Sequence, residues 1–182
     1  MENKGENARL GKIFFTADQH FGHKNIAKYT ERPWKEVNEM DRQLIFNHNQ
    51  VVKEEDTVYH IGDFAWGTAS YKIENILSRM NGTHHLILGN HDLLRPFTYV
   101  NCGFTSVHTS LTLTFDDVLL VLAHDPSVSQ VAVNIMFLCG HIHRLFKVQG
   151  NCLNVGIDIW EYLPVSLDMV LTIAKEFYKE KK

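Results

Sequence analysis

Five apolar runs of strand length recur along the chain, and each one ends in a polar residue. The runs are KIFFTAD (12–18), TVYHIGD (57–63), HHLILGN (84–90), VLLVLAHD (118–125) and IMFLCGH (135–141). Their β-branched and aromatic residues predict strands. Three of the runs pass through a glycine just before the polar end, and we expect these glycines to let the backbone turn sharply.

Helical spacing of apolar residues separates several of these strands. Residues 36–52 and 70–80 repeat apolar side chains at intervals of three and four, which predicts two amphipathic helices. A third helix is expected in the tail, with Ser166 as its N-cap and a lysine-rich end that suits a helix C-terminus. Strand-like runs in the second half, with a hairpin turn at Asp116 and Asp117, favour a mixed α/β sandwich over a simple doubly wound sheet.

The composition narrows the class of protein. The chain has 182 residues, of which 45% are hydrophobic and 21% are charged, so we expect one globular domain over residues 1–182. The net charge of −3 provides no overall attraction to nucleic acid or to an anionic membrane. We therefore expect no extended nucleic-acid surface and no membrane partner.

The termini and the cysteines favour a cytoplasmic location. The first residues, MENKGENARLGK, are too polar for a secretory signal, and no apolar run approaches the ~20 residues that span a bilayer. Cys102, Cys139 and Cys152 are odd in number and lack C-x-x-C spacing. This argues against a disulfide framework and a cysteine zinc site, and it indicates a reducing compartment.

The polar residues that follow the five strands form an ordered set of metal-binding types. Functional groups gather at the carboxyl ends of strands in α/β sheets, so we expect these side chains to meet. Oxygen and imidazole donors without thiolates suit divalent first-row metals, and seven candidates are enough for two ions that share a carboxylate. The set contains Asp18 and His20 (D-x-H), Asp63 (G-D), Asn90, His91 and Asp92 (G-N-H-D), His124, and His141 and His143 (G-H-x-H).

In this order the motifs resemble those of the calcineurin-like metallophosphoesterase superfamily, over residues 12 to about 160. The segments HFGHKNI, RPW, DTVYHIGDF and LILGNHD are similar to a group of small bacterial and phage phosphoesterases of undetermined substrate. The resemblance implies an α/β, metallophosphoesterase-type sandwich of two mixed β-sheets flanked by helices. It also implies hydrolysis of phosphate esters by a metal-bridging hydroxide.

The resemblance implies a metal role for each of the seven ligand candidates. One ion would be held by Asp18, His20 and His143, and the second by Asn90, His124 and His141, with Asp63 as the bridge. Two divalent ions are therefore expected. Mn²⁺ is favoured, while Fe²⁺, Ni²⁺ and Zn²⁺ also tolerate mixed nitrogen and oxygen ligands.

Four further residues are implied to act on the substrate. His91 would touch the scissile phosphate and protonate the leaving oxygen, with Asp92 orienting its ring. His23 and Arg32 follow the D-x-H motif and are candidates for substrate contact, although a solvated helix face is the simpler interpretation of this basic segment.

Two departures from related motifs favour a phosphodiester or a small nucleotide-type substrate. Protein phosphatases of the superfamily carry an arginine after G-D that grips a phosphomonoester, whereas this chain reads GDFAWG. Asp125 adds a carboxylate beside His124 that would repel a highly charged monoester. A phosphomonoesterase or protein phosphatase is the alternative activity.

Two other classes of protein share these motifs. A non-catalytic scaffolding module of the same fold typically loses a key histidine, often that of G-N-H, but His91 and every ligand position are present here. A nuclease would share the metal chemistry, but an acidic chain without an added DNA-binding domain argues against processive work on nucleic acid.

The remaining aromatic residues are given structural roles. The three tryptophans, Trp34, Trp66 and Trp160, could either stack on nucleic-acid bases or pack in the core, and we favour packing. Among the histidines outside the motifs, His60 either hydrogen-bonds behind the site or is an inert strand residue, and His84 and His85 are expected to be solvated.

Overall fold

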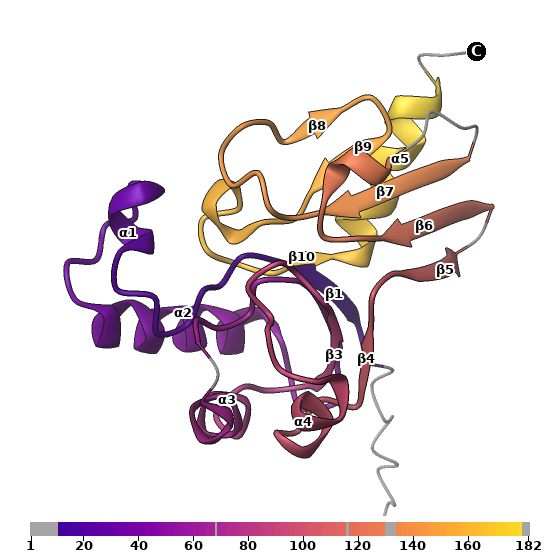
Figure 1. Ribbon diagram of the computed structural model, residues 1–182. Coiled ribbons are helices and arrows are strands. Elements are labelled where there is room, and N and C mark those ends of the chain that lie inside the picture. Colours follow the sequence, from indigo (N-terminus) through magenta and orange to yellow (C-terminus); the bar gives the residue numbers. More distant parts are fainter. Residues whose placement is uncertain (1–10, 68, 116, 130–133, 180–182) are drawn as a thin grey trace, which may run out of the picture.

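The computed structural model describes residues 11–67, 69–115, 117–129 and 134–179 and contains two five-stranded sheets (Figure 1). The first sheet has the order β10 (Val165–Ser166), β1 (Ile13–Thr16), β2 (Thr57–Ile61), β3 (Thr83–Ile87) and β4 (Ser106–His108). The second has the order β5 (Leu111–Phe115), β6 (Val118–Leu122), β7 (Ile135–Cys139), β9 (Cys152–Asn154) and β8 (Val148–Gln149).

Both sheets mix parallel and antiparallel pairs. In the first, β1 to β4 run parallel and β10 pairs antiparallel with β1. In the second, β6, β7 and β9 run parallel, while β5 and β8 pair antiparallel with β6 and β9 at the edges. The predicted sandwich of two mixed sheets flanked by helices is confirmed.

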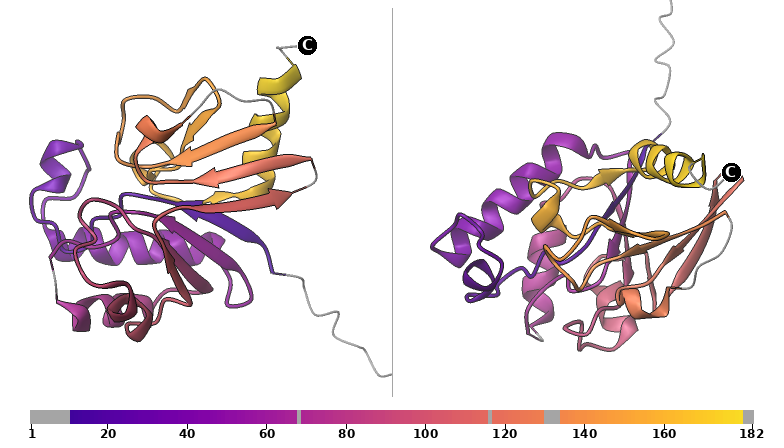
Figure 2. Two further views of the ribbon diagram at one scale, coloured as in Figure 1. Left: turned by 45° about the vertical axis from the view of Figure 1, so that its right-hand side comes forward. Right: turned by 90° about the horizontal axis from the view of Figure 1, so that it is seen from above.

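The helices lie on defined sides of this sandwich. Figures 1 and 2 show α2 (Val37–Val51), α3 (Ser70–Leu77) and α4 (Pro96–Asn101) on the face of the first sheet that is turned away from the second. The last helix, α5 (Leu167–Lys179), packs against β1 and β10. Two of these helices, α2 and α3, match the predicted helices, and so does α5, whereas α4 and the short α1 (Ile26–Tyr29) were not predicted.

Two predicted local signals can be compared with the structure. The hydroxyl of Ser166 accepts a hydrogen bond from the Met169 amide at 3.3 Å, as expected of an N-cap of α5. Strands β5 and β6 form the expected antiparallel pair, with Phe115 opposite Val118. Of the two predicted turn residues, Asp116 lies outside the described residues.

Strand alternation divides the apolar side chains between two cores. Phe15, Ile61 and Ile87 of the first sheet are fully buried against the second sheet and α5. The other face of the first sheet, with Leu86, packs against helical residues such as Met40. Fully burying one such side chain contributes about 1.5–3 kcal/mol, so the first sheet is held firmly on both faces.

The carboxyl ends of strands from both sheets meet at one edge. Ala17, just after β1, forms a bridge with Gly156, which follows β9 in the second sheet. The Asp18 amide donates to the Gly62 carbonyl at 3.0 Å, which joins the ends of β1 and β2. The predicted metal ligands follow β1, β2 and β3 in one sheet and β6 and β7 in the other, so this edge positions them all.

A chain of buried histidines lies between the first sheet and α2. His84 is 5% exposed, so the prediction that it is solvated is wrong: on β3 it faces the helix layer together with Leu86. Gln19 donates to His60 Nδ1 at 3.1 Å, His60 Nε2 lies 3.0 Å from His84 Nδ1, and His84 Nε2 lies 3.4 Å from the Met80 carbonyl. An amide donor at one end and a carbonyl at the other require both rings to be neutral.

The neighbouring histidine at the start of β3, His85, is only partly solvated. His85 is half-buried, its ring stacks on Tyr59 at a centroid distance of 4.9 Å, and its Nδ1 lies 2.7 Å from the Ser106 hydroxyl. His60 lies behind the candidate site, as one of the two interpretations proposed, and is hydrogen-bonded to Gln19 of the D-x-H loop.

No helix in the described part of the chain is long and apolar enough to cross a membrane.

The buried histidines should make the fold sensitive to acid. Burial lowers the pKa of His48 on α2 to about 4 and also lowers the pKa values of His60 and His84. A histidine in the unfolded chain titrates near 6.5, so the unfolded chain binds more protons at lower pH. The contribution of these histidines to stability is therefore complete above about pH 6.5 and is lost as the pH drops from there toward about 4.

Substitution of His48 tests this pH dependence. Between about pH 7.5 and about pH 5, His48 alone should lower the free energy of unfolding of metal-free protein, measured in urea, by about 2 kcal/mol. His48→Gln keeps a donor for the Asn81 carbonyl, which His48 Nε2 contacts at 2.9 Å, and should remove this contribution. His108→Gln, at a histidine outside the cluster, is the control. Identical pH profiles for wild type and His48→Gln would contradict the expectation.

Candidate metal centre

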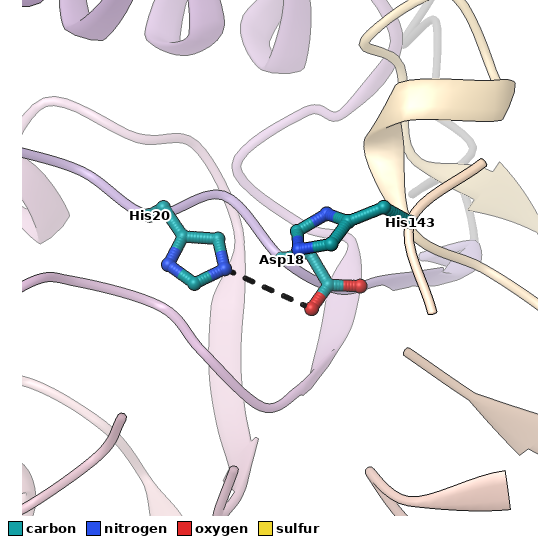
Figure 3. A group of neighbouring side chains, drawn as sticks. All are labelled: Asp18, His20 and His143. Carbon is teal, nitrogen blue, oxygen red and sulfur yellow. Dashed lines mark ion pairs between the residues drawn. The ribbon is translucent and has the colours of Figure 1, made fainter. Parts of the chain in front are cut away.

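Three predicted ligands of the first ion meet at the end of β1. Asp18 and His20 are buried, and His143 reaches them from the loop after β7 (Figure 3). One ligand atom from each of the three lies within 4.8 Å of the other two. His20 Nε2 is 4.0 Å from Asp18 Oδ1. The grouping predicted for one ion is therefore present in space.

The predicted ligands of the second position lie beside the first group. Ligand atoms of Asp63 and His124 lie within 4.8 Å of one another and of Asp18. Asn90 Oδ1 lies 3.1 Å from His124 Nε2 and 2.9 Å from His141 Nδ1, which brings the remaining two candidates to the same place. All seven residues thus converge, in two groups that share Asp18.

Asp63 lies between the two groups with one oxygen toward each. Its Oδ2 is 3.5 Å from His20 Nε2, and its Oδ1 is 3.4 Å from His124 Nε2. A carboxylate that faces two sets of donors in this way can bind two cations at once. The bridging role expected for Asp63 stays a prediction, because the residue that the two groups share is Asp18.

His20 provides an independent indication that the site holds a ligand. It is 2% exposed, yet neither ring nitrogen has a hydrogen-bond partner in the structure. Buried polar atoms are almost always paired, and an unpaired one requires an explanation. Burial lowers the pKa of His20 to about 3, so the ring is neutral and its nitrogen lone pair is available. A divalent cation fits this donor set.

Carboxylates and imidazoles in the cluster hold one another in charged states. Burial raises the pKa of Asp18 to about 6, although His124 and His143 oppose the rise. Burial would raise the pKa of Asp63 too, but the hydrogen bond and charge of His124 hold it at about 2. Burial alone would lower the pKa of His124, and its contacts with Asp63 and Asp18 raise it to about 9. A cation would replace the proton on His124.

Several ligands occupy a backbone conformation that residues other than glycine seldom adopt. The φ angle is positive at Asp18 (59°), His20 (52°), Asp63 (55°), His141 (72°) and His143 (46°). The left-handed region costs an L-residue roughly 1–2 kcal/mol. Such strain concentrates at functional sites, where the surrounding structure enforces it. The sequence pattern contained no signal for this feature.

The glycines at the strand ends differ in purpose, which corrects the expectation that all three supply a sharp turn. Gly62 does have a positive φ of 85°. At Gly89, however, a Cβ would lie 2.2 Å from Asp63 Oδ1, and at Gly140 it would lie 2.8 Å from Asp18 Oδ2. These two glycines are required because the carboxylates lie against their Cα atoms.

Arg32, predicted as a candidate for substrate contact, is instead bound to groups of the protein and is not exposed. Its side chain is fully buried and forms a two-pronged ion pair with Asp158, with nitrogen–oxygen distances of 2.8 and 3.1 Å. It also donates to the carbonyls of Asp18 and Gln19 at 2.7 and 2.9 Å. The guanidinium therefore fixes the backbone of the D-x-H loop by hydrogen bonds to two of its carbonyls.

Asp158 is a site residue that the sequence reasoning missed. It lies on the short 3₁₀ helix Ile157–Ile159 and accepts a hydrogen bond from His143 Nδ1 at 2.8 Å. This fixes the ring of His143 with Nε2 free for a metal. A signal did exist: CLNVGID repeats the pattern of an apolar run, a glycine and an aspartate.

Asp92 has a different partner from the one expected. Its Oδ2 accepts from the amides of Asp63 and Gly89 at 2.8 and 2.9 Å, and its Oδ1 accepts from the Phe64 amide at 3.2 Å. No contact between Asp92 and the ring of His91 is present among these bonds. Asp92 instead ties the GNHD loop to the GD loop and so positions Asp63.

His91 and Trp66 lie partly exposed beside the metal ligands, and the buried His23 packs against Trp66. The side chain of His91 is 35% exposed, and its Nε2 lies 3.9 Å from Asp63 Oδ2. The ring centroid of Trp66 is 4.8 Å from that of His91 and 3.9 Å from that of His23. Trp66 is 47% exposed, so the expectation that it packs in the core is wrong.

Similar proteins are known by sequence and by structure, although no protein-family model matches the chain. The uncharacterized protein MJ1445 of Methanocaldococcus jannaschii is 31% identical over 177 residues, which cover 92% of this chain and 93% of that protein. The Gene 66 protein of Mycobacterium phage L5 is 27% identical over 218 residues, with 94% and 98% covered.

Among solved structures, the protein of unknown function AQ665 from Aquifex aeolicus superposes with a TM-score of 0.72 at 21% sequence identity. The superposition covers 90% of this chain and 99% of that one. The two chains therefore share a fold over nearly their whole lengths.

Gly89→Ala should disrupt the metal centre. The added Cβ would meet Asp63 Oδ1 and its amide at 2.2 and 2.5 Å, so the carboxylate must move. We expect a loss of Mn²⁺ affinity of roughly 10- to 100-fold, measured by calorimetry, because displaced ligand support typically has this effect. Gly150→Ala is the control: its φ of 60° makes alanine strained, but a Cβ there meets nothing within 4 Å. Unchanged affinity in Gly89→Ala would refute the steric argument.

Metal binding should also release protons. His124 is protonated near pH 7, and its proton must leave before Nε2 can bind a cation. Calorimetric titration of metal-free protein with Mn²⁺, in buffers of different ionisation enthalpy, should indicate about one proton released from His124. The affinity should rise as the pH approaches 9. A binding enthalpy that is independent of the buffer would contradict this expectation.

Proposed function

Because the chain belongs to the family of the MJ1445 protein and its motifs resemble those of the calcineurin-like metallophosphoesterase superfamily, we propose that it is a metal-dependent phosphoesterase. We further propose that it hydrolyses phosphodiesters or small nucleotide-type substrates at a centre for two divalent ions. The observation that carries the proposal is the place of Asp63, whose Oδ2 lies 3.5 Å from His20 Nε2 and whose Oδ1 lies 3.4 Å from His124 Nε2.

The residues present fit a pair of divalent cations. Asp18, His20 and His143 would hold one, Asn90, His124 and His141 the other, with Asp63 between them. Two such ions, when bound, supply a hydroxide nucleophile at neutral pH and positive charge for the phosphate oxygens. The carboxylate and amide oxygens of the donor set suit Mn²⁺, the ion we propose, and the imidazoles also suit Fe²⁺, Ni²⁺ and Zn²⁺.

His91 is the residue that we propose as the proton donor. Its ring lies at the mouth of the site, with its centroid 5.4 Å from that of His20, and it remains 35% exposed. An oxygen derived from water bonds to phosphorus while the bond between phosphorus and the leaving-group oxygen breaks. His91 gives its proton to the leaving-group oxygen. The ring regains a proton from solvent. Such proton transfer contributes about 10²–10⁴-fold to a rate.

Other residues act by positioning. The His91 amide donates to Asp63 Oδ1 at 2.9 Å, so the backbone of the proton donor is held against this carboxylate. Asp92 accepts hydrogen bonds from the amides of Asp63, Phe64 and Gly89 and so fixes the two loops that carry Asp63 and His91. Asp158 and Arg32 hold His143 and the D-x-H loop.

The features near the site support a diester over a phosphomonoester. The GDFAWG segment lacks the arginine that grips phosphomonoesters in related phosphatases, and Arg32 is committed to Asp158 and two carbonyls. Asp125 remains exposed beside His124, with one oxygen accepting from the Ser127 amide at 2.8 Å. The alternative functions are a phosphomonoesterase, a protein phosphatase and a scaffolding module of this fold. Their ligand would be a small phosphorylated compound or a protein instead of a diester.

A panel of monoester, diester and cyclic-nucleotide substrates, assayed with Mn²⁺ and with chelator, tests this function. We expect hydrolysis that depends on metal and favours bis(p-nitrophenyl) phosphate over p-nitrophenyl phosphate. Absence of hydrolysis in the presence of bound metal would favour the scaffolding function. A strong preference for the monoester would overturn the proposed substrate class.

His91→Ala separates proton donation from phosphate binding. Diesters with poor leaving groups should slow by roughly 10²–10⁴-fold, while activated nitrophenyl esters slow much less, because only the former need a proton. Mn²⁺ affinity should stay close to that of the wild type. Equal slowing for both kinds of ester would contradict the role of His91 as an acid.

A further inference from the structure

Trp66 is exposed beside the proton donor. Of its neighbours in GDFAWG, Phe64 is fully buried and Ala65 is 6% exposed, and both belong to the core, whereas Trp66 is 47% exposed. The Trp66 amide donates to the Phe21 carbonyl at 2.8 Å, so the backbone that carries the indole is held by the D-x-H loop. The indole is therefore turned outward at a fixed place.

Aromatic rings pack around Trp66, of which His23 is only 8% exposed, so the accessible rings are those of Trp66, His91 and Tyr29. The ring centroid of Trp66 lies 3.9 Å from that of His23 and 4.8 Å from that of His91, and His23 in turn lies 6.2 Å from Tyr29. The ring of Tyr29 is 69% exposed. A large apolar ring that stays half in water next to reactive groups is typical of a contact site for a ligand.

The other two tryptophans do not share this position. Trp34 is partly buried and packs edge-on against Tyr162 at a centroid distance of 4.6 Å. Trp160 donates through its indole nitrogen to the Asn154 carbonyl at 2.8 Å, and Lys147 covers its ring. Both have the packing role expected from the sequence, so only Trp66 is placed to meet a substrate.

We propose that Trp66 is a specificity-determining residue that stacks on the nucleobase of a nucleotide substrate, on the side from which the leaving group departs. The proposal rests on the proposed function, because His91 defines that side by protonating the leaving oxygen. The ring of Trp66 lies beside that of His91. A leaving alcohol that is placed to receive the proton of His91 therefore brings the group it carries next to the indole. A nucleobase suits this surface, since every base has a flat π-face and stacks on aromatic rings without regard to sequence.

A matched pair of cyclic esters tests the proposal. Adenosine 2′,3′-cyclic phosphate and the 2′,3′-cyclic phosphate of methyl riboside carry the same ester, but only the first has a base. With Mn²⁺, Trp66→Ala should raise KM for the adenosine ester by roughly 10- to 100-fold, as expected for loss of one stacked base. Values of kcat for both esters and KM for the base-free ester should change little.

Control variants separate stacking from a structural effect. Trp66→Phe keeps an aromatic ring and should restore most of the affinity, whereas Phe46→Ala, at an exposed aromatic residue on α2, should match the wild type. If Trp66→Ala raises KM equally for both esters, or for neither, the role of Trp66 in specificity is overturned while the phosphoesterase function stands. If the wild type with bound Mn²⁺ hydrolyses neither ester nor any ester of the panel, the proposed function is overturned and this inference with it.

Discussion

Two carboxylates, Asp18 and Asp63, are buried among histidines where the ends of the two sheets meet, and the rest of the structure depends on keeping them there. A buried carboxylate is unfavourable unless it is paired or bound to a cation. Here the histidines supply part of the pairing, which is why the pKa of Asp63 is lowered and that of His124 is raised. A divalent ion would complete it.

The layers around these carboxylates form a support that extends well beyond the ligands. Arg32 and Asp158, both fully buried, join the loop after β1 to the 3₁₀ helix after β9 and so fasten the two sheets together behind the site. Asp92 does the same for the loops after β2 and β3. These contacts explain how the chain maintains several ligands with positive φ, since the strain is opposed by many hydrogen bonds.

The histidine chain behind the first sheet connects the site to the helix layer. Gln19 stands between Asp18 and His20 in sequence, and it is hydrogen-bonded to His60 and Thr16. The chain continues through His84 to the carbonyl of Met80 near the end of α3. A polar network of this kind, when fully paired, fixes one arrangement of the core, and it ties the loop that carries two ligands to the packing of the helices.

The sequence alone determined the positions of the main strands and helices, because strand and helix periodicity are local properties of the chain. It also identified the seven ligand candidates, since a polar residue at the end of an apolar strand is visible without the fold. Only the tertiary structure decided the roles that depend on distant partners. Arg32 is structural because Asp158, 126 positions later, lies beside it, and Asp92 faces backbone amides rather than His91. The burial of His84 follows from the face of β3 that it occupies. The exposure of Trp66 follows from its place in the bend that is bonded to Phe21, a residue far away in sequence.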